Sequence, residues 1–190
     1  MFGVLVARAP SGEQICFRAF SGQYNGLWQV PGWVDPVFDL NTFHQVHDRE
    51  EREIKRLTKK ISRLASGDQD LQEFVQMRKE KSQQLMRSIH SLYRLRNFQG
   101  QTAGLEKIFG TNKGIPSGAG DCCAPKLLQH AALHGLKPLG LAEFYLGREN
   151  ASDTRQHGNF YPSCRAKCYP ILGFMLCGLE QSGGDIGDMR

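Results

Sequence analysis

Five of the six cysteines in this 190-residue chain lie after residue 120. They include two clusters, Cys122 with Cys123 and Cys164 with Cys168. Zinc takes three or four thiolate or imidazole ligands in a tetrahedron, and a thiol ionises more easily at the N-terminus of a helix. Cys164 and Cys168 are one helical turn apart in sequence, so they share a face if this segment is helical. The spacing therefore predicts a metal site that includes Cys122, Cys164 and Cys168.

The predicted fourth ligand is His157, which lies shortly before the second cluster. Cys123 is an alternative ligand to Cys122, because only one of two adjacent cysteines is expected to direct its thiol inward. Zinc is the cofactor that this donor set would take. A simpler interpretation, in which the clustered cysteines are small buried hydrophobes, stays open. It is the prediction for Cys16 and Cys177, which lie within apolar patterns.

The composition is that of a soluble globular protein, with 40% hydrophobic residues and 23% charged residues. The formal net charge of +5 permits binding to nucleic acid or to acidic surfaces without requiring it. No apolar run approaches the roughly 18 residues of a membrane span, and the apolar run at the N-terminus is too short for a secretory signal. We therefore expect a cytoplasmic protein with reduced thiols and no membrane partner.

A long segment at 41–98 differs from the rest, because glycine almost vanishes and Leu, Glu, Lys, Arg and Gln dominate. Its apolar residues recur at heptad spacing, as in Ile54, Leu57, Ile61 and Leu64. This pattern predicts two long helices that pack as an antiparallel coiled-coil hairpin. Such a hairpin could also serve as an oligomerisation arm, for example in a dimer.

Basic residues crowd the first of these predicted helices. They have two interpretations, a solvated helix face or an arm that contacts RNA phosphates without reading sequence. Lys126 and Lys167 flank the cysteines and could meet phosphate or lower the pKa of a thiol. The candidate RNA-binding residues are therefore Arg52, Lys55, Arg56, Lys59, Lys60, Arg63, Lys126 and Lys167.

The remaining segments predict an α+β fold with a three-layer α/β core. Apolar runs at 2–7 and 14–22 surround a Pro/Ser/Gly turn and predict a β-hairpin. A loop rich in Gly and Pro follows, in which Trp28 and Trp33 either pack on the core or stack on a flat ligand. The predicted domains are a core at 1–40 and 99–181, an inserted helical hairpin at 41–98 and a flexible tail at 182–190.

Two strands, a cysteine-headed helix, a strand and a second cysteine-headed helix follow one another along the core. This order resembles the zinc nucleobase-deaminase core, in which two helices supply the metal ligands. That family needs a glutamate two residues after the first ligand, where this chain has Ala124 or Pro125. Glu143 and Asp121 are the candidate substitutes for that catalytic residue. The resemblance implies a deaminase-like scaffold that has lost the reaction, with an active zinc hydrolase as the alternative.

A second resemblance covers most of the chain. It rests on Phe2-Gly3-Val4-Leu5-Val6, Ala19-Phe20-Ser21-Gly22-Gln23, the helical hairpin, Gly120-Asp121-Cys122-Cys123-Ala124-Pro125-Lys126-Leu127-Leu128, Leu136-Lys137-Pro138, Ala142-Glu143-Phe144, and the run from His157 to Leu172. These stretches are similar to the long N-terminal region of certain bacterial RluA-type pseudouridine synthases. In that family the region precedes a domain that converts uridine to pseudouridine in rRNA or tRNA.

The catalytic domain of that family carries a His-Arg-Leu-Asp motif, and this chain has no such motif. The nearest fragment, Tyr93-Arg94-Leu95-Arg96, lacks the aspartate. The resemblance therefore implies an RNA-binding accessory region that works with a synthase domain, in the same chain or in a separate one. It does not imply that these residues isomerise uridine themselves. A purely structural or oligomerisation module is the remaining alternative.

Overall fold

The computed structural model of the chain describes residues 1–65, 68–110, 114–148 and 155–179. It divides into two compact units, Met1–Val37 with Arg94–Arg190 and Phe38–Tyr93. The predicted tail at 182–190 and residues 66–67 of the predicted turn between the long helices lie outside the described residues. The chain combines helices with antiparallel sheets, so the predicted α+β class is confirmed.

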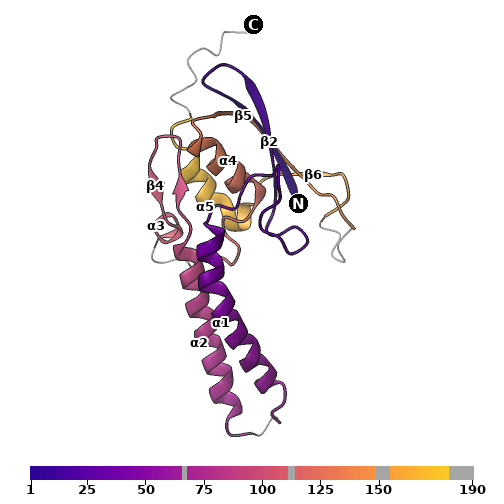
Figure 1. The fold of residues 1–190 in the computed structure, drawn as a ribbon, viewed down its shortest axis with the longest axis vertical. Helices are drawn as coiled ribbons and strands as arrows, with labels where there is room; N and C mark the ends of the chain where they lie inside the picture. The colour runs from indigo at the N-terminus through magenta and orange to yellow at the C-terminus, as the bar shows by residue number, and fades with distance from the viewer. Residues whose placement is uncertain (66–67, 111–113, 149–154, 180–190) are drawn as a thin grey trace. The chain divides into compact units, whose positions relative to one another are not determined.

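The first unit is built on a four-stranded sheet in the order β2-β1-β5-β6, with every neighbouring pair antiparallel (Figure 1). The predicted hairpin is its first half, with Phe2 paired to Phe20 and Arg8 paired to Gln14. Turn residues around Gly12 close it. The strands are β1 (Phe2–Arg8), β2 (Gln14–Phe20), β5 (Lys137–Phe144) and β6 (Phe160–Tyr161).

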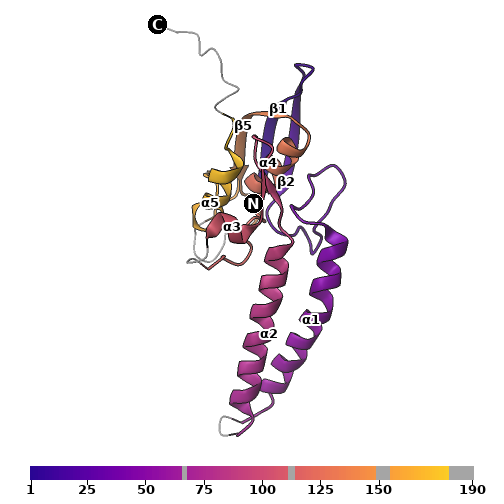
Figure 2. The same ribbon diagram turned by 90° about the vertical axis from the view of Figure 1, so that its left-hand side faces the viewer.

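Two helices, α4 (Cys123–Leu133) and α5 (Arg165–Met175), cover one face of this sheet (Figure 2). Leu5 and Ala7 alternate inward from β1 and are fully buried in the core with Leu127 of α4. Residues of both helices share a cavity with Leu5, so they lie on the same side. Within the described residues of this unit, no helix covers the opposite face. The described core has one helical layer over the sheet, and the prediction of three layers is not confirmed.

Smaller elements complete this unit. A two-stranded ribbon precedes α4 in the chain and is tied to it, because the Gln129 side chain accepts from the Arg96 amide at 2.9 Å and donates to the Arg94 carbonyl at 2.8 Å. These elements are β3 (Leu95–Arg96), β4 (Thr102–Ala103) and α3 (Leu105–Phe109).

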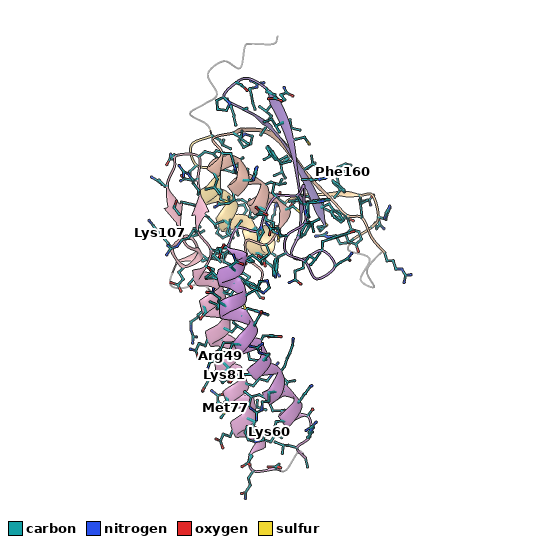
Figure 3. All side chains as sticks on the ribbon, viewed as in Figure 1. Arg49, Lys60, Met77, Lys81, Lys107 and Phe160 are labelled. Carbon is teal, nitrogen blue, oxygen red and sulfur yellow. The ribbon has the colours of Figure 1, made fainter. Side chains whose placement is uncertain are left out.

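The second unit is a pair of antiparallel helices, α1 (Leu40–Ile61) and α2 (Leu71–Ser91). Asp39 caps α1, because its Oδ1 accepts from the Thr42 amide at 2.8 Å. Ile54 is buried, in agreement with the apolar spacing. Lys81 of α2, which is labelled in Figure 3, forms an ion pair with Glu53 of α1 at 2.8 Å. Whether the pair has coiled-coil packing stays a prediction.

Among the described residues, no helix combines the length and the apolar character that a membrane span needs.

Candidate metal centre and candidate nucleic-acid interface

Three of the cysteines selected from sequence meet at the helix-covered side of the core. The sulfur atoms of Cys122, Cys164 and Cys168 all lie within 4.8 Å of one another. Cys122 is the N-cap residue of α4 and Cys164 is the N-cap residue of α5, while Cys168 follows one turn into α5. Cys168 is fully buried and the other two are half-buried. Two helix N-termini, each with partial positive charge, therefore converge on the thiols.

The pKa values of Cys122 and Cys168 shift in opposite directions. A hydrogen bond from the Cys122 thiol lowers the pKa of Cys168, and the backbone at Gly120 and at Cys122 lowers it further. The same bond to Cys168, followed by burial, raises the pKa of Cys122 far above its ordinary value. Cys168 is therefore the first of this pair to become a thiolate, and Cys122 holds a proton toward it.

This donor set can hold a metal ion. Three thiols are a soft set that suits zinc, whose bonds to sulfur are about 2.3 Å long, so that two sulfurs in a tetrahedral site are about 3.8 Å apart. The sulfurs here need to close by only about 1 Å or less to reach that separation. Among the described residues the group contains no histidine and no carboxylate. A fourth position is therefore left for water or for a ligand from elsewhere.

His157 and Cys123 lie outside this group. His157 is exposed, and its Nδ1 is 3.3 Å from both the amide nitrogen and the carbonyl oxygen of Gly147. Cys123 faces the sheet, where its Sγ is 3.6 Å from the Ala19 carbonyl oxygen, and burial raises its pKa to about 12. The structure thus places neither of these predicted ligands with the other thiols.

Cys16 and Cys177 are exposed, so their prediction as buried hydrophobes is wrong. Cys16 alternates to the solvent side of β2, and Cys177 lies just beyond the end of α5. An apolar sequence pattern shows that a segment has an inner face, but it does not show on which face each cysteine lies.

Glu143 is buried and lies at the beginning of α4. Its Oε1 accepts from the Ala124 amide at 3.0 Å, and it thereby satisfies an N–H in the first turn of that helix. The carboxylate also helps to raise the pKa of Cys123. Asp121 precedes the same helix and opposes the lowering of the Lys126 pKa. The helix-capping role of Glu143 was not predicted from sequence.

Lys126 has a different role from the one predicted. Its side chain is 1% exposed, and its ammonium donates to the Phe20 carbonyl at 3.0 Å and to the Gly22 carbonyl at 2.9 Å. Burial lowers its pKa. The ammonium joins α4 to the end of β2 and is not available to RNA, so that prediction is wrong for Lys126. Lys167 is exposed on α5.

The basic residues of α1 fall into two groups. Lys55 pairs with Glu51 at 3.2 Å. The ammonium of Lys60, which is labelled in Figure 3, lies 3.6 Å from the centroid of the Phe74 ring. The others are exposed and have no ion pair within the described ranges. They are Arg49 and four of the predicted RNA-binding residues, Arg52, Arg56, Lys59 and Arg63, and we name these four the cationic stripe. Arg63 lies just after Ser62, the C-cap residue of α1.

The cationic stripe follows one face of α1 and ends in the turn after it. Spacings of four and three residues place Arg52, Arg56 and Lys59 one above another on the helix. These three lie opposite the face on which Ile54 is buried, and they span about 10 Å at 1.5 Å per residue. The arrangement is a candidate interface for a polyanion.

No family model, curated protein or solved structure matches this chain.

Proposed function

We propose that this chain is an RNA-associated, non-catalytic domain of the kind found at the N-terminus of RluA-type pseudouridine synthases. The cationic stripe contacts RNA phosphates, and zinc at the three cysteines stabilises the core. The partner is a synthase catalytic domain, in the same chain or in a separate one, and the RNA is rRNA or tRNA. The observation that carries this function is a set of four exposed cations without an ion pair among the described residues, three on one face of α1 and Arg63 just after it.

The stripe suits phosphates because none of its four cations forms an ion pair with a described residue. Each cation that meets a phosphate releases a condensed counterion, so affinity falls with salt by a slope of about 0.7 per contact on single strands and 0.9 on duplexes. Four contacts therefore give a slope of about 3 to 4. Phosphate contacts position RNA without reading its sequence, which suits an accessory region whose partner supplies the chemistry.

Zinc would have a structural role here. Held by Cys122, Cys164 and Cys168, it would join the N-termini of α4 and α5, and its binding free energy would add to the stability of the fold. The chemistry that zinc supplies is the neutralisation of the thiolates at this junction. The protein contributes the thiols and the two helix dipoles that favour their ionised forms.

The test is the affinity of the whole 190-residue chain for a single-stranded RNA, measured by fluorescence anisotropy between low and physiological salt. We expect binding at low salt, with a slope of log affinity against log salt of about 3. Failure to retain RNA at low salt would refute the proposed function.

A deaminase-type zinc hydrolase is the second candidate, and the position of Glu143 favours it. The sequence lacks the family's glutamate at residue 124. The Glu143 carboxylate, however, accepts a hydrogen bond from the backbone amide of Ala124. A carboxylate therefore lies beside the helix that Cys122 begins. The test is deamination of cytidine by the zinc-loaded chain, compared with Glu143→Gln. Absence of uridine from the reaction of the unmodified chain eliminates this candidate.

A further inference from the structure

A pocket lies at the open edge of β2, and the side chain of Arg18 lines it. The pocket has a volume of about 530 Å³, within the range of small-ligand sites. Its lining includes Cys16, Phe17, Arg18, Trp33 and His130. The sequence pointed to Trp33 as a residue that packs or stacks on a flat ligand, and neither the metal site nor the cationic stripe uses it.

Arg18 is fixed in one orientation while most of its donors stay unused. Its Nε donates to the Gly32 carbonyl at 2.9 Å, and its guanidinium carbon lies 4.9 Å from the centroid of the Trp33 ring. A side chain on Gly32 would approach the guanidinium to 2.9 Å, so glycine there leaves space for it. The Nη groups have no partner within the parts of the chain that the structure describes. A guanidinium held this way suits a phosphate, because two parallel N–H groups match its oxygens.

Aromatic rings supply flat surfaces on both sides of the strand. Trp33 is itself held by Phe2 and Phe20, each with a ring centroid 5.7 Å away. Phe17 and His130 lie 4.6 Å apart. Burial, followed by the charge of His134, lowers the pKa of His130, which therefore presents a neutral ring at pH 7. The charge of Asp35 opposes this lowering of the His130 pKa, and the Asp35 carboxylate accepts a hydrogen bond from Gln29.

The strand edge adds main-chain groups to these surfaces. The Arg18 carbonyl accepts from the Val34 amide at 3.0 Å, so it faces away from β1. A residue in an antiparallel strand directs its N–H and its C=O to the same edge, and the next residue but one does the same. The Arg18 N–H and both main-chain groups of Cys16 therefore face the open edge. They offer donors and an acceptor to the polar rim of a base.

We propose that this pocket binds one nucleoside monophosphate unit. The phosphate meets the Nη groups of Arg18, and the base stacks on the Trp33 side and bonds to the free edge of β2. For its natural source, an unpaired nucleotide within RNA, this site rests on the proposed function. Base stacking on aromatic and guanidinium planes is the usual way in which proteins hold unpaired RNA bases.

The test is alkylation of Cys16 by a maleimide, followed by peptide mapping, with 5′-UMP or a short oligouridine as the ligand. Cys16 is exposed in the pocket, and the exposed Cys177 is an internal control. We expect saturating ligand to slow labelling of Cys16 at least fivefold and to leave Cys177 unchanged. Protection by oligouridine but not by UMP assigns the site to an RNA strand, and protection by both also admits the free nucleotide.

Two arginine variants test whether protection of Cys16 depends on Arg18. Arg18→Gln should abolish protection, whereas Arg8→Gln, which removes the same charge from the neighbouring strand, should retain it. If Arg18→Gln does not fold, Trp33→Leu is used in its place. Equal labelling of Cys16 with and without either ligand would overturn the nucleotide site, as would equal protection in both arginine variants. Salt-dependent RNA binding that persists beside such a result leaves the proposed function standing, so the two failures are distinguishable.

Discussion

Gly3 of β1 and Cys123 of α4 approach so closely that a β-carbon on Gly3 would lie 2.6 Å from the β-carbon of Cys123. The helix therefore rests directly on the strand at its first residue. Because Cys122 immediately precedes this contact, the same approach sets the height of the metal site above the sheet. A glycine in a sequence run that otherwise predicts a strand is thus explained by a close approach of backbone to helix.

Gly3→Ala should destabilise the fold. The nearest atom is a β-carbon, which cannot rotate away, so the helix must shift, and overpacking of this kind costs about 1–3 kcal/mol. The measurement is urea denaturation followed by circular dichroism. Gly140→Ala is the matched control, because it lies on β5 with open space around its missing β-carbon. Equal midpoints for the two variants would show that the contact does not constrain the helix.

Lys126→Met should lower the free energy of unfolding by about 1–3 kcal/mol, because the Phe20 and Gly22 carbonyls lose a buried donor. Methionine keeps the length of the apolar stem, with sulfur in place of one methylene, and lacks the ammonium. Thermal unfolding of Lys126→Met and of the exposed control Lys167→Met gives the comparison. An unchanged midpoint for Lys126→Met would contradict the role of this lysine as a clamp.

Zinc should bind with one equivalent per chain and raise the unfolding midpoint, and a chelator should reverse both effects. Cys168→Ser should lose them, because it removes the thiol that ionises first. Binding should also release protons, since the raised pKa of Cys122 keeps that thiol protonated in the metal-free chain. Metal analysis and calorimetry in two buffers measure these quantities, with Cys16→Ser as the control. Zinc retention by Cys168→Ser would place the metal elsewhere.

Stability should fall as the pH is lowered from 7.5 to 5.5, in part because of His130. Its pKa is lowered in the folded chain from an ordinary value of 6.5, so the unfolded chain binds more protons below that value. The neutral ring therefore contributes stability above about pH 6.5, and this contribution is lost as the pH falls through the folded pKa. His130→Phe keeps a ring beside Phe17 and should show a smaller loss in urea denaturation. Identical pH dependence in the two proteins would count against the burial of His130.

The elements that local periodicity specifies were predicted from sequence. The β-hairpin alternates with period two around a turn, and the long helices carry their apolar residues at heptad spacing. Cys122, Cys164 and Cys168 gather because each begins a helix or lies one turn inside it. His157 does not join them, because closeness in sequence across a loop does not determine closeness in space.

The burial of Lys126 and the helix-capping contact of Glu143 were not predicted, because each is a polar residue in buried surroundings. Helix α4 is apolar around most of its circumference, which predicts burial on all sides, and Lys126 lies within it. Glu143 shares the inward face of β5 with Leu141. Both patterns were visible in the sequence. The partners that make these positions tolerable, two carbonyl groups and a helix amide, come from distant segments and could not be predicted from it.

The most direct measurement is the salt dependence of RNA binding by two variants of equal charge. One replaces the cationic stripe in Arg52→Gln, Arg56→Gln, Lys59→Gln and Arg63→Gln together. The other removes four exposed cations of the first unit in Arg8→Gln, Lys107→Gln, Arg148→Gln and Arg165→Gln. The stripe variant should lose the slope of about 3, and the control should keep most of it. Equal slopes in the two variants would contradict RNA binding through α1.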